Sequence, residues 1–151
     1  MPRIHLTTFI AAPVERTFDV CRSIDLHRKS MAHTSEEAVA GTVTGLIGPE
    51  ETVTWKARHL LKTRFLRSKI TAFDRPYFFT DEMVKGDFKL LKHEHHFKPA
   101  ENGTLMIDLL DFETPYGIAG RMLNRLYLFN YLRNLLIARN RVLKEFAESD
   151  Q

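Results

Sequence analysis

The sequence contains a single cysteine, Cys21, so no disulfide bond can form within the chain. This excludes the small disulfide-framed folds of secreted domains and is typical of a reducing compartment, so we expect a cytoplasmic protein. Cys21 follows Val14 and Phe18 at helical spacing. This apolar pattern predicts a buried structural thiol rather than a nucleophile.

A long uninterrupted apolar run is also missing. The opening residues, MPRIHLTTF, do not contain the apolar core of a signal peptide. The most apolar stretch, residues 118–137, is interrupted by Arg121, Arg125 and Arg133. Because a membrane-spanning helix needs about 20 consecutive residues of mainly apolar character, we predict no insertion into a membrane.

Charge of one sign is scarce as well, because the formal net charge is only +3. Several basic residues do cluster on neighbouring predicted strands: Lys56, Arg58, Lys62, Arg64, Arg67 and Lys69. The aromatic platform on which nucleic-acid bases stack is not evident on the same outward face. The cluster therefore indicates a solvated strand surface, and we expect no nucleic-acid partner.

The residues that are present suit one globular domain. A chain of 151 residues is most simply a single domain, residues 1–151, and a hydrophobic fraction of 44% is enough for a core. Eleven phenylalanines indicate a core or a cavity wall that is rich in aromatic surface. No internal repeat or low-complexity segment divides the chain.

Hydrophobic periodicity divides the chain into strands and helices. Residues 3–10 are predicted to form a strand, and residues 13–30 two short helices. Pro13 suits the first turn of the first helix, and Ser23 is a candidate cap of the second. The period then changes to two, and turn residues separate about six further strands. Residues 118–148 are predicted to form one long helix.

This order of elements predicts an α+β fold. Successive hairpins imply a curved antiparallel sheet of about seven strands, with two short helices after the first strand. The long C-terminal helix must then cover one face of the sheet. A strongly curved sheet around a single helix tends to leave a cavity between them.

The histidine-rich segment KHEHHF, residues 92–97, is divided by strand alternation between two faces. His93 and His95 are predicted to point inward, whereas Glu94 and His96 point to solvent. The same alternation turns three further groups inward: Val53, Trp55, Ala57, His59 and Leu61; Phe79, Asp81 and Met83; and Met106, Asp108, Leu110 and Phe112.

The long helix has an apolar stripe with one charged residue near its middle. Leucines, a valine and a phenylalanine form the stripe: Leu128, Leu132, Leu135, Leu136, Val142, Leu143 and Phe146. The charged residue is Arg139. Because an unpaired buried charge is very costly, we predict an ion pair between Arg139 and either Asp108 or Asp81.

Several segments resemble those of the SRPBCC superfamily, the START and birch-pollen-allergen-like helix-grip group: FIAAPVERTFD, VTWKARHL, ITAFDRPYFFTDEMVKGDFKLLKHEHHF, GTLMIDLLDFETPYG and ARNRVLK. The resemblance spans essentially the whole chain and is nearest to bacterial single-domain ligand-binding members, some of which are labelled cell division inhibitors. It implies a seven-stranded antiparallel sheet that grips the C-terminal helix around a largely apolar cavity. It implies no single function, because the superfamily includes lipid carriers, hormone receptors, polyketide cyclases and oxygenase domains.

Binding of a small hydrophobic or amphipathic molecule in this cavity is the function that the residues favour. A mostly apolar wall with a few polar groups is what a ligand pocket needs. The residues predicted to form the ligand site are Trp55, His59, Phe79, Asp81, Met83, His93, His95, Met106, Asp108, Phe112 and Arg139.

A cyclase- or dehydratase-like enzyme is the main alternative. It would use a pocket histidine with Asp108 as general acid and base. No nucleophile elbow or phosphate-binding loop accompanies these residues, so binding without catalysis is preferred. A protein-interaction module would instead need an apolar patch on the outer side of the sheet, where Phe88 and Leu90 are candidates.

A metal site would take His93 and His95 as ligands, with His59 or Asp108 as the third. The sequence offers neither a confirming cysteine nor a second pair of histidines two residues apart. We therefore expect no metal and no cofactor.

Overall fold

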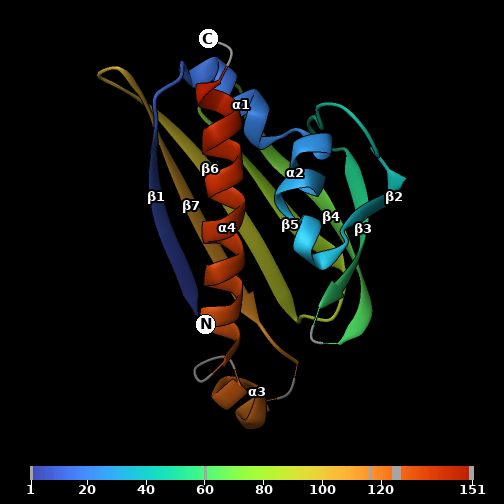
Figure 1. Ribbon diagram of the computed structural model, residues 1–151. Coiled ribbons are helices and arrows are strands. Elements are labelled where there is room, and N and C mark those ends of the chain that lie inside the picture. The colour runs from blue at the N-terminus through green and yellow to red at the C-terminus, as the bar shows by residue number, and fades with distance from the viewer. Residues whose placement is uncertain (1, 60, 116, 124–126, 150–151) are drawn as a thin grey trace.

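Seven strands form one antiparallel sheet in the computed structural model, which describes residues 2–59, 61–115, 117–123 and 127–149 (Figure 1). The strands are β1 (Arg3–Ile10), β2 (Glu37–Gly41), β3 (Thr52–His59), β4 (Lys62–Asp74), β5 (Phe78–Lys85), β6 (Leu90–Ala100) and β7 (Gly103–Glu113). The helices are α1 (Val14–Cys21), α2 (Ile24–Ser30), the short 3-10 helix η1 (Ala32–Thr34), α3 (Gly117–Leu123) and α4 (Phe129–Glu148).

The strands lie in the order β1-β7-β6-β5-β4-β3-β2, and every neighbouring pair is antiparallel. Strands β2 to β7 follow one another as neighbours, whereas β1, the first strand in sequence, pairs with β7, the last. Figure 1 shows the sheet curving around α4. The pairing of β6 with β7 sets His95 directly opposite Asp108, which places the candidate site.

Helix α4 crosses the concave side of the sheet, with α1 and α2 beside it (Figure 1). It contacts β1, α1 and α2. Leu136, Leu143 and Ala147 of α4 are buried, whereas Asn134 and Arg141 are exposed. This alternation follows the helical period and confirms that one face of α4 is directed toward the interior.

The prediction of one helix over residues 118–148 is wrong. The structure has two helices, and α3 lies at the foot of α4 along a different direction (Figure 1). Residues 124–126 lie outside the described part of the chain. Leu128 is buried, whereas Ile118 and Met122 of α3 are exposed, so the part of the stripe that packs inward starts only near α4. Helix propensity is a local property and does not distinguish one helix from two in succession.

Helices α1 and α2 bury apolar faces of their own. Phe18 of α1 is fully buried and meets the rings of Phe73, Phe79 and Phe97 edge-on, with centroid distances of 5.2 to 5.4 Å. Ser23 caps α2 as predicted, since its side chain accepts a hydrogen bond from a backbone N–H in the first turn. This aromatic cluster fixes α1 against the sheet.

Three local predictions need correction. Pro13 is the N-cap residue of α1, with extended backbone (φ −58°, ψ 152°), and the helix begins one residue later. Leu61 is 89% exposed with a positive φ of 65°, because β3 ends at His59 and the chain turns there toward β4. Phe146 is 41% exposed, and the guanidinium carbon of Arg16 lies 5.7 Å from the centre of its ring. Phe146 therefore lies outside the buried face of α4, although the next residue, Ala147, is fully buried.

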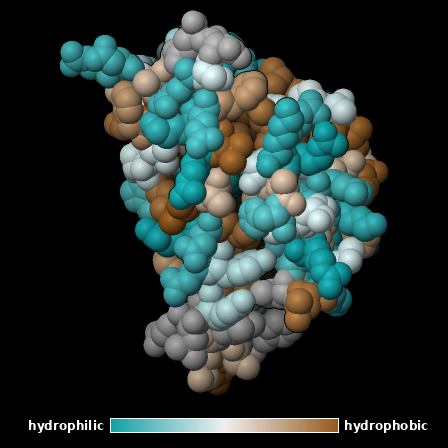
Figure 2. All heavy atoms as spheres, viewed as in Figure 1, coloured by the Kyte–Doolittle hydropathy of each residue, from teal (hydrophilic) through white to brown (hydrophobic). Residues whose placement is uncertain are grey.

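The face that presents α4 is mixed in character. Figure 2 shows hydrophilic side chains spread over this face, with hydrophobic ones between them. Of the two residues considered for an outer interaction patch, Phe88 is half-buried against the core and Leu90 is also half-buried. Among the described residues, no helix combines the length and the apolar character needed to cross a bilayer.

Candidate functional site

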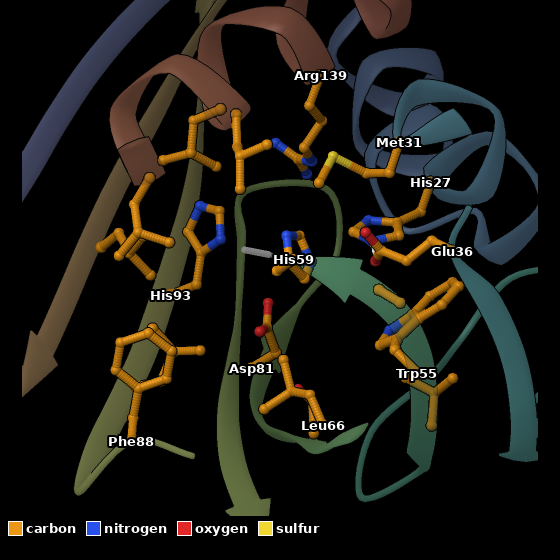
Figure 3. Close-up of a pocket in the computed structure, with 18 of the residues that line it drawn as sticks. His27, Met31, Glu36, Trp55, His59, Leu66, Asp81, Phe88, His93 and Arg139 are labelled. Atoms are coloured by element: carbon orange, nitrogen blue, oxygen red, sulfur yellow. Dashed lines mark hydrogen bonds and ion pairs between the residues drawn. The ribbon is translucent and has the colours of Figure 1, made fainter. Parts of the chain in front are cut away.

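A cavity of about 360 Å³ lies between the sheet and helices α2 and α4. Figure 3 shows Arg139 extending toward it from α4 and His93 from β6. His27, Glu36 and Trp55 lie on the opposite side in that view. Much of the wall is apolar, with contributions from Ile47, Val53, Ile70, Leu110, Leu132 and Leu136.

The structure places the predicted site residues in two groups. Seven line the cavity: Trp55, His59, Phe79, Asp81, His93, His95 and Arg139. Four others, although described, are not part of its wall: Met83, Met106, Asp108 and Phe112. Met106 and Phe112 are packed into the core, Asp108 has no exposed surface, and Met83 is half-buried outside the cavity. Strand alternation predicts the face of a sheet, but not which part of that face a helix covers.

Asp108 is the centre of a buried polar network beneath the cavity wall. Its Oδ1 accepts hydrogen bonds from His93 Nε2 at 2.8 Å and from Arg139 Nη1 at 3.4 Å. Its Oδ2 accepts one from Asn140 Nδ2 at 2.8 Å, and Arg139 also donates to Oδ1 of Asn140 at 2.8 Å. Of the two acids predicted to pair with Arg139, Asp108 is the one in contact with it.

His95 connects this network to the cavity. Its Nε2 lies 2.6 Å from Oδ2 of Asp81, and its Nδ1 lies 3.5 Å from Oδ1 of Asp108 and 3.6 Å from Sγ of Cys21. The ring stacks on Phe79 and on His93, with centroid distances of 4.2 and 3.7 Å. Contacts at both nitrogens and at the ring faces hold the imidazole in one orientation.

The charges of the network balance. Burial alone would raise the pKa of Asp108, but hydrogen bonds from His93 and His95 hold it well below its usual range. Burial would lower the pKa of His95, yet Cys21, Asp108 and Asp81 raise it well above its usual value. Burial and the charge of His95 lower the pKa of His93 to about 4. Near neutral pH, two carboxylates therefore face one imidazolium and one guanidinium, while His93 is uncharged.

His93 leaves one nitrogen open to the cavity. Because a carboxylate only accepts, the neutral ring has its proton on Nε2, which donates to Asp108, and Nδ1 keeps a lone pair. No described residue bonds to this Nδ1, and the atom is not sealed in the core. Asp81 similarly uses only one carboxylate oxygen, the one bonded to His95. The polar wall, formed by Asp81, His93, His95 and Arg139, thus presents two open acceptors.

A second pair of polar contacts lies on the other side of the cavity. Nδ1 of His59 is 2.7 Å from the hydroxyl of Tyr131, and Glu36 accepts from Nε2 of His27 at 2.7 Å. Burial lowers the pKa of His59, so this ring is neutral near pH 7. His59, considered above as a third metal ligand, is paired with Tyr131.

Solved structures match this architecture over nearly its whole length, although neither a protein-family model nor a curated protein sequence matches the chain. Protein TTHA0849 from Thermus thermophilus has a TM-score of 0.79 and 21% identity, over 99% of this chain and 100% of that one. Major latex-like protein 151 from Panax ginseng has a TM-score of 0.71 and 14% identity, over 97% of each chain. Protein Ms6760 from Mycobacterium smegmatis has a TM-score of 0.71 and 16% identity, over 99% of this chain and 92% of that one.

The chain has the helix-grip fold. The predicted seven-stranded sheet around a C-terminal helix is thereby confirmed. At these identities the likeness concerns the fold alone. The function therefore depends on the side chains of the cavity between the sheet and α4.

Three side chains of the helix-grip cavity offer metal-binding atoms near one another. One atom each of Asp81, His93 and His95 lies within 4.8 Å of the other two. The metal hypothesis had named His59 or Asp108 as the third group, and the structure brings Asp81 there instead. Nε2 of each histidine is already bonded to a carboxylate, at 2.8 and 2.6 Å. Nδ1 of His93 is open to an ion, but at His95 the ion would have to displace a proton, so the absence of a metal stays our prediction.

Two members of the network were missed in the sequence. Asn140 is 3% exposed and lies four residues after Leu136 and three before Leu143, a spacing that could have placed it on the buried stripe. Cys21 was interpreted as purely structural. Its polar contacts come from α4 and β6, which are distant in sequence, so no local pattern indicates them.

Proposed function

We propose that the protein binds a small, mostly apolar molecule with a hydrogen-bond donor group, held in the cavity between the sheet and α4. The cavity volume of about 360 Å³ falls within the range of small-molecule sites. The observation that carries the proposal is Nδ1 of His93, an acceptor without a partner among the described residues. A polar atom in an apolar cavity is costly to leave unbonded, and a ligand donor would satisfy it.

The polar wall also indicates which end groups are acceptable. The open oxygen of Asp81 and Nδ1 of His93 both accept hydrogen bonds, so a hydroxyl or N–H group on the ligand suits them. Since the carboxylate of Asp81 stays ionised, it would repel an ionised acid. Burial would raise the pKa of Asp81, but the hydrogen bond from His95 lowers it. We therefore favour neutral phenols, alcohols and amines over carboxylic acids.

Two matched ketones test this proposal. Para-hydroxyphenyl ethyl ketone and phenyl ethyl ketone differ by one hydroxyl group. Their binding can be followed through Trp55, which lines the cavity and is the only tryptophan of the chain. A hydrogen bond with a net value of about 1 kcal/mol should make the hydroxylated ketone bind up to about tenfold more tightly.

His93→Gln is the informative variant, because a glutamine amide can still donate to Asp108 while the acceptor at Nδ1 is lost. The preference for the hydroxylated ketone should shrink in this variant. His96→Gln changes the same residue type on the outer face, where His96 is bonded to Glu94, and should retain the preference. Equal binding of both ketones to the wild-type protein, or no binding of either, would contradict the proposal.

Catalysis by the pair of His93 and Asp108 is the second candidate, and their contact at 2.8 Å favours it. A general base is most effective when its pKa lies near the working pH. The pKa of His93, lowered to about 4 by burial and by the charge of His95, makes it a weak base at neutral pH. Native mass spectrometry first shows whether the purified protein retains a small molecule. That molecule is then incubated with fresh protein and its mass is measured again, which separates the two functions. A carrier returns the molecule with its mass unchanged, and an enzyme does not.

The cytoplasm is the compartment that we propose for this binding function. Its support is the single cysteine, which suits a reducing environment. Detection of the tagged protein in a periplasmic or culture fraction would refute it.

A further inference from the structure

Cys21 lies at the end of α1 and lines the cavity. Nη2 of Arg139 donates to its Sγ at 3.1 Å, and Nδ1 of His95 lies 3.6 Å from the same sulfur. On the far side of the ring, Nε2 of His95 lies 2.6 Å from Oδ2 of Asp81. Cys21, His95 and Asp81 thus stand in the order of an activated nucleophile, its base and a carboxylate that orients the base.

The surroundings of the sulfur are positively charged. A guanidinium has only N–H donors, so Sγ must accept the hydrogen bond from Arg139. His95 keeps a second proton, because burial would lower its pKa but Cys21, Asp108 and Asp81 raise it well above the usual value. Positive charge beside Sγ stabilises the negative charge that develops on the sulfur as it attacks an electrophile.

The same wall has an unfilled polar contact. His93 stacks on His95 with 3.7 Å between ring centroids, and Nδ1 of His93 has no partner among the described residues. A molecule whose hydroxyl group bonds to this nitrogen would lie along the wall that contains Cys21. The thiol is therefore part of a site with room for a ligand, and not an isolated cysteine in the core.

We propose that Cys21 is a nucleophile that bonds covalently to hydroxyl-bearing α,β-unsaturated carbonyl compounds in the cavity. This inference rests on the proposed function, in that the cavity must admit a small and mostly apolar molecule. It assigns Cys21 a chemical role in addition to its place in the packing of α1.

The addition balances without a co-reactant. A bond forms between Sγ of Cys21 and the β-carbon, the carbon–carbon π bond breaks, and its electron pair moves to the carbonyl oxygen as an enolate. His95 gives its Nδ1 proton to the α-carbon as the enolate collapses, and the proton of the thiol replaces it on Nδ1, so His95 ends with the two protons it began with. One thiol and one unsaturated ketone give one thioether. Asp81 touches neither the sulfur nor the reacting carbons, so it acts as a positioning residue for His95.

The intact mass of the protein tests this addition, because Cys21 is the only thiol. The probe is para-hydroxyphenyl vinyl ketone, and its saturated analogue, para-hydroxyphenyl ethyl ketone, is the unreactive match. We expect one adduct per chain, mapped to Cys21, which forms at least about tenfold faster than on a free cysteine peptide. A rate no higher than that of the free peptide overturns the proposal, and so does an adduct that forms equally in Cys21→Ser.

Binding of the saturated ketone separates this inference from the proposed function. If the saturated ketone quenches the fluorescence of Trp55 but the vinyl ketone adds slowly, the nucleophile is refuted and ligand binding stands. If the saturated ketone does not bind, both proposals fail. Fast, saturable addition with binding of the saturated ketone supports both.

Variants of the two supporting residues test the mechanism. His95→Gln can still donate to Asp81 but lacks Nδ1, and its maximal addition rate at saturating ketone should fall at least about tenfold. Asp81→Asn should also lower the maximal rate, and Asp81→Glu should restore part of it. Maximal rates are compared so that a change in affinity does not enter.

His96→Gln, on the outer face of β6, is the matched control and should add the ketone at the wild-type rate. Circular dichroism checks that each variant is folded, and Asp81→Asn alone tests the mechanism if His95→Gln does not fold. Wild-type maximal rates in both variants would show a merely accessible cysteine and refute the arrangement.

Discussion

Strand β6 carries histidine–carboxylate contacts on both of its faces. On the outer face, His96 Nε2 lies 3.2 Å from Oε1 of Glu94, and the two side chains are 37% and 24% exposed. On the inner face, His93 Nε2 lies 2.8 Å from Oδ1 of Asp108, and the exposed fractions are 11% and 0%. Nearly the same chemical pair therefore occurs in two environments on one strand.

The environment decides what each pair contributes. Water screens the outer pair and solvates either member when the other is removed, so its contribution to stability is small. In the inner pair Asp108 has no exposed surface, so bulk solvent does not take the place of a lost partner. Its charges depend on one another through Asp108, Arg139 and His95, and removal of one member leaves the others uncompensated.

Asp108→Asn should have the largest effect on stability. The change nearly preserves the shape of the side chain but removes the charge that faces Arg139 and His95. Because an uncompensated buried charge costs about 3–5 kcal/mol, the free energy of unfolding should fall by about that amount in a urea titration. The outer control, Glu94→Gln, should change it by less than about 0.5 kcal/mol. Equal, small losses would mean that both faces of β6 are equally well hydrated.

The same contrast explains how much of the fold the sequence could predict. Alternation and turn residues are local, and they predicted the seven strands and the inward side of His93 and His95. The single helix over residues 118–148 failed because helical periodicity continues through α3 into α4. The different directions of α3 and α4 depend on tertiary contacts, which a local pattern does not contain.

The candidate site was predictable only as a set of inward residues. Asp108 and Phe112 point inward as expected, yet they lie in the core and not on the cavity wall. The contact of Arg139 with Cys21 joins residues that are 118 positions apart, and no spacing rule reaches that far. Arg139 could be identified because one charge in an apolar stripe demands a partner, whereas a lone cysteine makes no such demand.

Arg139→Leu should be the next largest change. The variant removes one of the two cations that balance Asp108 and Asp81, and the free energy of unfolding should fall by about 3 kcal/mol. Arg141→Leu on the exposed face of α4 is the matched control, with an expected change within about 0.5 kcal/mol. An unchanged or higher melting temperature for Arg139→Leu would show that apolar packing replaces the ion pair.

Inner and outer histidines should also differ in how they link stability to pH. Burial and the charge of His95 lower the pKa of folded His93 to about 4, against about 6.5 in the unfolded chain. As the pH falls below about 6.5, the unfolded chain takes up a proton that folded His93 does not, so stability falls. Over about 1.5 pH units this loss is about 2 kcal/mol, at about 1.4 kcal/mol per unit.

His93→Gln should remove this acid-side loss, whereas His96→Gln should retain it. Urea titrations at about pH 6.5 and about pH 5 measure the change in the free energy of unfolding for each protein. The comparison with His93→Gln is needed because burial also lowers the pKa of His59. His95 acts in the opposite sense. Its raised pKa contributes stability that is present below about pH 6.5 and is lost as the pH rises through the folded value. Identical acid profiles in all three proteins would place His93 in water like His96.

Zinc should produce the smallest effect, and its titration sharpens the comparison of the two faces. On the inner face, Asp81, His93 and His95 have metal-binding atoms within 4.8 Å of one another. On the outer face, no third such group of the described residues joins His96 and Glu94. Binding would nevertheless require His95 to lose a proton that Asp81 and Asp108 stabilise. We expect no saturable heat when zinc chloride is titrated into the protein in a calorimeter. Saturable heat that disappears in Asp81→Asn would contradict this expectation. It would mean that zinc binds to Asp81 and the inner histidines strongly enough to displace the proton of His95.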